Sequence, residues 1–576
     1  MKSKLTIFSI GLLLLIASSV VAQNEETVDR YSLWLGGHYV DTSSYAKKVG
    51  EYRLLEEAGN FLPSFKFGWQ SLRPNSTFNL DVDYLDYENI AGRATSRVGD
   101  RFSFDIQYRS LTRQLQQDLL ANAETREAGG GKILTHDLQD AGVDYSYHRR
   151  EILSKVSVLL DRENKVKFSA SHRSILKSGS EQAIASNHCL SCHLTSISRD
   201  VESSSHQFQA GLDAEVAKYD VGYQFGYRLY ESHVPAPTAY YEEARHPVNG
   251  GSGAEFSPRQ LYDDTTLAFS GKPKTEKMSH KLRVKGDLGK GRFAGSVSYS
   301  RSENKYSDLT SDAWVGAFKY AVVLDPKTRL IARATGVRRD ADDPYIDVRA
   351  FREGRGNPLN LQSNFDYQRL SALDRADAEI TAEVIRRLNP KTTLAVLAGF
   401  NRVDRYGYPN SEDNLVSNTF IGQAKLNYRK GLKYSASVKY RFEKTSDPFT
   451  TFKGLFEERG RELLTRDVTA PGSFAFIFYW EREALRYQTT TTEPTDRHEF
   501  SWNSTWRPTL KTSVNVGLKG FYDKNGDLDS LDVKHFSLQP NLSLTTTPTP
   551  KWSFTAGYTY NMNTSRGPVA VALFDG

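Results

Sequence analysis

Apolar and polar side chains alternate strictly along many short segments of this chain. In Phe78–Tyr84, aromatic and aliphatic residues take every second position, and asparagine or aspartate lies between them. A repeat of two residues with one polar face predicts a half-buried β-strand. The same pattern recurs in six further segments, namely 102–108, 208–214, 221–229, 434–440, 514–518 and 552–560.

The two faces of these strands predict a fold class. In a transmembrane β-barrel, the apolar face of each strand meets lipid and the polar face lines a wet lumen. Aromatic residues at the ends of the runs, such as Tyr84 and Tyr440, fit the girdles at the membrane interfaces. A large soluble β-sandwich or β-helix array is the alternative, but turns at solenoid spacing are missing. We therefore expect an all-β, transmembrane, antiparallel up-and-down β-barrel.

Short polar turns alternate with long polar stretches, which predicts the strand number and the orientation. Leu324–Thr328 and Leu388–Thr392 share the turn pattern L-[DN]-P-K-T, in which proline presets the backbone. Long polar stretches cover 231–276, 338–369 and 443–472. Outer-membrane barrels have short periplasmic turns and long extracellular loops, so the proline turns should face the periplasm. One hairpin about every 45 residues predicts roughly 20–26 strands.

The N-terminus has the pattern of a secretory signal peptide. A basic start is followed by an apolar run from Leu5 to Ala17 and by small residues that end at Ala22. We place the cleavage site after Ala22, so the signal peptide is 1–22 and the mature chain is one barrel domain, 23–576. No later apolar run has the length of about 20 residues that a transmembrane helix needs. These features predict a bacterial outer-membrane location.

Composition agrees with one large barrel and excludes a nucleic-acid partner. Tyrosine (31) and phenylalanine (30) dominate the apolar residues, glycine (41) is frequent and methionine (3) is rare. The chain has 75 basic and 69 acidic residues, a formal net charge of +6. This balance is too even to indicate a nucleic-acid partner. No composition break or linker divides the 576 residues.

Cys189-Leu190-Ser191-Cys192-His193 contains the only two cysteines of the chain. C-x-x-C-H is the spacing at which c-type haem is attached, because two thioethers hold the porphyrin and the histidine reaches the iron. A disulfide or redox-active dithiol is a second interpretation, since exported proteins favour oxidised cysteines. A metal site is a third, although Cys₂His leaves one position open. We expect the motif in a loop over about 176–204, on the side of the long loops.

If haem c binds, Cys189 and Cys192 are its attachment sites and His193 is its proximal ligand. Met278 and Met562 are the only methionines of the mature chain, so a histidine is the better distal ligand. The candidates are the residues that flank the expected loop, His172 and His206, and after them His148. For each of these histidines, an ordinary exposed or interfacial residue is the alternative. His188 is next to Cys189, and the tether holds it away from the opposite face of the iron.

The mature N-terminal region resembles a known family. The segments Gly36–Asp41 and Tyr45–Gly59 are similar to the start of MtrB/PioB proteins, and the repeated L-[DN]-P-K-T turns also look like that family. The resemblance implies an outer-membrane barrel that sheathes a periplasmic multihaem c-type cytochrome in a porin–cytochrome conduit for extracellular electron transfer. It also implies contact with a surface-exposed multihaem cytochrome.

Two features depart from that family. Some members carry C-x-x-C near the mature N-terminus, whereas here the pair is at 189 and 192 and a histidine follows it. Outer-membrane barrels commonly end on an aromatic residue, whereas Phe574 lies two positions before the end. The role of the N-terminal pair in the family is therefore not carried over to Cys189 and Cys192.

Three functions compete at this point. The first is the electron-conduit sheath, which gives C-x-x-C-H a role as a single haem c site. The second is a general or substrate-specific diffusion porin with a structural or redox-active C-x-x-C disulfide. The third is an enzyme on a barrel, but the chain contains neither G-x-S-x-G nor H-E-x-x-H. We expect no enzyme activity.

Overall fold

β-Strands are the regular secondary structure of the described residues, and turns and irregular segments connect them. The computed structural model describes residues 27–39, 61–120, 126–128, 131–143, 145–188, 192–241, 265–342, 345–346, 367–368, 374–406, 416–448, 493–526 and 533–567. No helix in these ranges is long and apolar enough to cross a membrane. The predicted signal peptide, 1–22, lies outside the described residues.

Contacts between Cα atoms divide the chain into two compact units. The first unit comprises 1–116, 144–179 and 206–208, and the second comprises 117–143, 180–205 and 209–576. The prediction of one domain over 23–576 stays a prediction.

The first unit is an antiparallel series in which each strand pairs with the next strand of the unit. Its strands are β1 (Val28–Tyr39), β2 (Phe61–Arg73), β3 (Ser76–Tyr84), β4 (Ile90–Val98), β5 (Phe102–Leu115) and β8 (Tyr145–Asp161). Two longer strands have residues in both units, β9 (Val166–His188) and β10 (Cys192–Val216).

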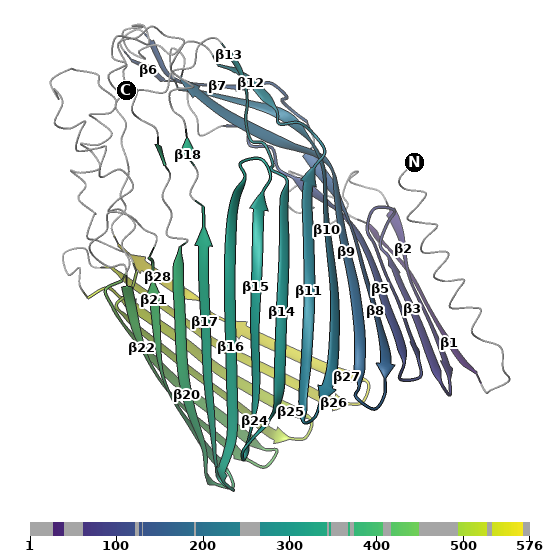
Figure 1. Cartoon of the computed structure of the whole chain (residues 1–576), viewed down its shortest axis with the longest axis vertical. Coiled ribbons are helices and arrows are strands. Elements are labelled where there is room, and N and C mark those ends of the chain that lie inside the picture. Colours follow the sequence, from purple (N-terminus) through teal and green to yellow (C-terminus); the bar gives the residue numbers. More distant parts are fainter. Residues whose placement is uncertain are drawn as a thin grey trace. The chain divides into compact units, whose positions relative to one another are not determined.

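The second unit continues the series in chain order from β11 to β27 (Figure 1). The strands of this series are β11 (Tyr219–Ser232), β14 (Thr275–Leu288), β15 (Gly291–Asn304), β16 (Leu309–Asp325), β17 (Thr328–Ala341), β20 (Arg375–Asn389), β21 (Thr392–Asp404), β22 (Val416–Lys430), β23 (Tyr434–Ser446), β24 (Asp496–Thr509), β25 (Thr512–Lys524), β26 (Lys534–Thr549) and β27 (Trp552–Thr559).

Shorter strands complete the second unit. They are β6 (Arg126–Ala128), β7 (Gly131–Leu138), β12 (Thr238–Tyr241), β13 (Thr265–Ala268), β18 (Tyr345–Ile346), β19 (Tyr367–Gln368) and β28 (Met562–Arg566). β28 pairs with β26, whereas β12–β13 and β18–β19 are separate hairpins. Twenty-four of the described strands belong to one sheet, which lies within the predicted number.

The predicted proline turns are the tight turns of this sheet. Asp325 Oδ1 accepts a hydrogen bond from the Lys327 amide at 2.7 Å, and Asn389 Oδ1 accepts one from Lys391 at 2.9 Å. Such a bond lets an Asp or Asn side chain replace a backbone partner and fixes a turn two residues long. The register shifts just before both turns, so the strands enter them through a bulge.

The strands have one apolar and one polar face, as the alternation predicts. On β20, Ile380 is 63% exposed, while its neighbours Glu379 and Thr381 point to the other face. Phe420 on β22 is 54% exposed in the same way. Only eight hydrophobic side chains among the described residues are buried, so no central core holds these strands together.

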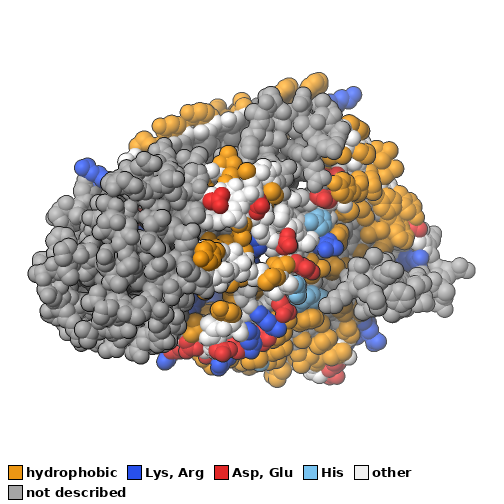
Figure 2. Space-filling view, turned by 90° about the horizontal axis from the view of Figure 1, so that it is seen from above, with side chains coloured by type: hydrophobic (Ala, Val, Ile, Leu, Met, Phe, Trp, Pro, Cys, Tyr) orange, Lys and Arg blue, Asp and Glu red, His pale blue; other side chains and the backbone are white. Residues whose placement is uncertain are grey.

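An exposed apolar face of this extent is the surface that lipid covers. In Figure 2 the hydrophobic side chains form broad patches, and many of the charged side chains in view lie among polar ones. The prediction of an all-β, antiparallel, up-and-down fold of the transmembrane-barrel type is confirmed. The predicted outer-membrane location agrees with this fold.

Candidate functional site

The C-x-x-C-H motif lies where the two longest strands of the sheet meet. β9 has 23 residues and ends at His188, and β10 has 25 residues and begins at Cys192. The expected loop over 176–204 is therefore wrong, because nearly all of it is strand. Cys189 lies outside the described residues, and for Cys192 and His193 the structure gives the backbone alone.

The start of β10 also pairs with a second strand. β7 runs parallel to it, with Leu134 opposite Cys192 and Thr135 opposite His193. This parallel pairing departs from the antiparallel pattern of the rest of the sheet. It adds a second backbone partner beside the motif, which stiffens the end of the hairpin.

Ion pairs fix the part of the hairpin below the motif. Glu181 on β9 pairs with Arg199 on β10 and, at 2.6 Å, with Lys272, which precedes β14. Burial would raise the pKa of Glu181, but hydrogen bonds from Lys272 and Arg199 outweigh it and lower that pKa. A strand needs only about 9–11 residues to cross a membrane, so Glu181 lies beyond the crossing part of β9.

Side-chain amides and carboxylates tie a further segment to the same hairpin. Gln182 Nε2 donates to the Ser196 hydroxyl at 2.6 Å and to the Asp118 carbonyl at 2.8 Å. Asp140 accepts a hydrogen bond from the Ser198 amide at 2.5 Å. The segment before β6 and the turn after β7 are therefore both attached to the hairpin. We call the ion-paired residues of this end, Glu181, Arg199 and Lys272, the platform.

His172 and His206 lie together but not beside the motif. Their rings stack at 5.7 Å between centroids, and His172 also stacks on Phe208 at 4.4 Å. On β10, His206 follows His193 by thirteen positions. The prediction of His172 or His206 as the distal haem ligand stays a prediction.

Their surroundings explain this pair of histidines. Phe168 and Phe208, which share the face of His172 and His206, are 39% and 49% exposed. The pair therefore belongs to the apolar face of the sheet. His148, the third candidate, has Nδ1 at 3.1 Å from the Thr112 hydroxyl, so its ring is bound to a neighbouring strand.

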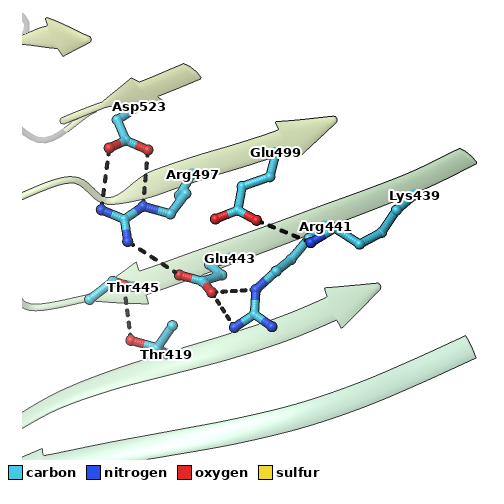
Figure 3. Close-up of polar contacts among 8 residues, drawn as sticks. All are labelled: Thr419, Lys439, Arg441, Glu443, Thr445, Arg497, Glu499 and Asp523. Carbon is cyan, nitrogen blue, oxygen red and sulfur yellow. Dashed lines mark hydrogen bonds and ion pairs between the residues drawn. The ribbon is translucent and has the colours of Figure 1, made fainter. Parts of the chain in front are cut away.

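The polar face of β22–β25 carries a charged network that sequence reasoning missed (Figure 3). Arg497 donates two hydrogen bonds to Asp523, Nε to Oδ1 at 3.1 Å and Nη2 to Oδ2 at 3.3 Å. Arg441 binds Glu443 at 2.5 Å, and Glu443 also lies 4.0 Å from Arg497.

Two further contacts extend this network. Lys439 binds Glu499 at 3.4 Å, and the hydroxyls of Thr419 and Thr445 lie 2.9 Å apart. The network thus contains three basic and three acidic side chains and is neutral as a whole. In the sequence, the charged residues at every second position of 439–443 and 497–499 could have indicated this network. The pairing of β23 with β24 was needed to bring them together.

No other arrangement of metal-binding residues competes with the motif in the described part of the chain. No group of three or more His, Cys, Asp or Glu residues there has the geometry of a metal site.

No family model matches the chain, and no curated protein matches it. Solved structures of similar arrangement include the copper transporter OprC, with 7% identity over 91% of this chain and 74% of that one and a TM-score of 0.43. The FrpB iron transporter from Neisseria meningitidis has 8% identity over 92% and 74%, with a TM-score of 0.43. A loop-deletion mutant of OmpT, an outer membrane protein of Vibrio cholerae, has 9% identity over 70% and 97%, with a TM-score of 0.27. At such identities and TM-scores, these likenesses decide neither family nor function.

Proposed function

We propose that this chain is an outer-membrane β-barrel that sheathes a multihaem c-type cytochrome and so allows electrons to cross the membrane. The observation that carries the proposal is the position of C-x-x-C-H. In the chain it joins β9 and β10, strands of 23 and 25 residues. A solute pore has no use for a haem-attachment motif at that point.

The two faces of the strands support this function. Lipid is an insulator, so a row of haems that crosses it needs a polar wall between itself and the acyl chains. The described strands supply such a wall, since apolar side chains such as Ile380 and Phe420 face one way and the charged network faces the other. An elongated cytochrome would lie against the polar face.

A haem would be attached at the end of this hairpin. Cys189 and Cys192 would hold it through thioethers, and His193 would ligate its iron; bound haem supplies one-electron transfer. The platform of Glu181, Arg199 and Lys272 would keep this end at a fixed position. His172 and His206 stay the predicted candidates for a second histidine ligand of the iron.

Purification from the native membrane in a mild detergent tests the proposal. We expect the chain to carry a haem-stainable band of its own and to bring multihaem cytochromes with it. The variant Cys189→Ala/Cys192→Ala should lose the band and keep the companions. A wild-type chain that conducts ions in planar bilayers and brings no haemoprotein would identify a diffusion porin and contradict the proposal.

A further inference from the structure

The polar face of β14–β17 is strongly basic, unlike the neutral network on β22–β25. We call this surface the basic wall and define it by the basic residues at alternate positions of the four strands, namely Lys277, Lys281, Arg283, Lys285, Arg292, Lys319, Arg329, Arg333 and Arg339. The carboxylates of that face on these strands are Asp287 and Asp325, both beside tight turns.

Like charges stand directly opposite one another in this wall. Lys319 on β16 is the register partner of Arg333 on β17. At the other end, Lys277 on β14 is the partner of Arg228 on β11. Like charges in directly opposed positions destabilise a sheet. These pairs concentrate positive charge on this face.

Carboxylates of the chain neutralise only part of the wall. The neutralised residues are Arg283, which pairs with Asp213 at 2.7 Å, Lys285, with Asp220 at 3.2 Å, Arg292, with Asp287 at 3.2 Å, and Arg333, with Glu383 at 3.2 Å. Lys281, Lys319 and Arg329 are exposed and form no ion pair with any residue that the structure describes.

Small side chains lie between the basic ones. β15 presents Ser296, Ser298 and Ser300 on the polar face, and β16 presents Ala313 and Ala317. Register pairs join these positions to the basic strands, as Lys281 is opposite Ser298. The long basic side chains therefore project beyond the small side chains around them, so a bulky partner can contact them.

The size of the wall indicates a macromolecule rather than a small anion. Lys277 and Lys285 are eight positions apart on β14, which is about 26 Å of strand. Four neighbouring strands add a width of about 14 Å at 4.8 Å per strand. A surface of this size is much larger than a small anion and can form part of an interface with a folded protein.

We infer that the basic wall of β14–β17 binds an acidic face of the protein partner that occupies the polar side of the sheet. This inference rests on the proposed function, because it assigns the strands against which the cytochrome would lie. Complementary charges of this kind set the register and orientation of a partner and speed its entry.

Labelled poly-L-glutamate is the defined probe for this inference, with fluorescence anisotropy of the detergent-purified full chain as the readout. The wall variant is Lys281→Gln/Lys285→Gln/Lys319→Gln. The control variant is Lys425→Gln/Lys439→Gln/Lys519→Gln, on the polar face of β22, β23 and β25. Each variant removes three positive charges, one lysine that pairs with a carboxylate and one like-charge cross-strand pair.

We expect the wall variant to bind poly-L-glutamate about tenfold more weakly, which corresponds to about 0.5 kcal/mol for each lost contact. The control variant should stay within about twofold of the wild type, and high salt should abolish the difference. Equal binding by the two variants, or equal binding of poly-L-lysine by the wild type, would overturn the inference.

The same variants separate this inference from the proposed function. If the wild type brings cytochromes from the native membrane, the wall variant should lose them and the control variant should keep them. If both variants keep the cytochromes, the basic wall does not bind them, and the proposed sheath function is unaffected. The wild type could instead bring no cytochrome and still bind poly-L-glutamate through the wall. That result would contradict the sheath function and support the binding of a different acidic protein.

Discussion

Arg497 and Asp523 face each other across β24 and β25, and the guanidinium donates to both carboxylate oxygens, at 3.1 and 3.3 Å. Asp523 is only 7% exposed, so this charge depends on its partner. Glu443, directly opposite Arg497 on β23, contacts the same guanidinium. One arginine thus links three neighbouring strands on their polar face.

Replacement of that arginine should therefore destabilise the sheet. We expect Arg497→Gln to lower the free energy of unfolding by about 1–3 kcal/mol, since it leaves a buried carboxylate without its donor. Urea unfolding followed by tryptophan fluorescence measures this loss. The double variant Arg497→Gln/Asp523→Asn should recover part of it, because the unpaired charge is gone. An unchanged midpoint for the single variant would show that the pair contributes nothing.

The apolar face should reject charge where the polar face accepts it. Ile380→Arg places a cation on the lipid side of β20, which costs about 2–4 kcal/mol near the middle of a bilayer. Gln423→Arg adds the same side chain to the polar face of β22. Folding into lipid vesicles, measured by heat-modifiable gel mobility, should fall for Ile380→Arg alone. Equal yields for both variants would mean that lipid does not cover the face of Ile380.

The phenol of Tyr406, just after β21, should ionise late. Its Oη lies 2.6 Å from Asp340 Oδ1 and from the Arg339 carbonyl. Burial and the hydrogen bond to Asp340 raise the pKa of Tyr406 to about 12. The folded state favours the protonated phenol. The contribution of Tyr406 to stability is therefore fully present below about pH 10 and is lost as the pH rises through the folded pKa of about 12. The difference in ultraviolet titration between the wild type and Tyr406→Phe reports this transition, and a difference centred near pH 10 would contradict it.

The ion pairs of the platform near the C-x-x-C-H motif should weaken at low pH. Because the pKa of Glu181 is lowered, the carboxylate stabilises the fold above its ordinary titration range, and this stability is lost as pH falls through the folded pKa. Hydrogen exchange of residues 192–199, corrected for intrinsic rates, should therefore rise at low pH. In Glu181→Gln the exchange should already be fast at pH 7. Identical pH profiles for the two proteins would exclude this role of Glu181.

The sequence predicted the strands and tight turns well because their signals are local. Alternation over 78–84 became β3, and the turn at Asp325 formed through a side chain two residues from its donor. Such features depend on neighbours in the chain, so one sequence is sufficient to find them.

The hairpin that carries the motif could not be found in this way. Residues 176–204 are rich in serine and other polar side chains, and a polar segment without alternation is typical of a loop. Distant partners make it a strand: β7 at the start of β10, Lys272 at Glu181 and Asp118 at Gln182. The stacking of His172 on His206 could not be found either, since it depends on the pairing of β9 with β10.

Electron transfer across a sealed vesicle tests the central claim most directly. The complex purified from the native membrane is placed in liposomes that contain a reduced redox dye, and a membrane-impermeant electron acceptor is added outside. The account predicts that the dye is oxidised only when chain and cytochrome are both present, and that a preparation of the wall variant, which loses the cytochrome, leaves the dye reduced. Oxidation by the cytochrome alone at the same rate, or none by the complex, would contradict it.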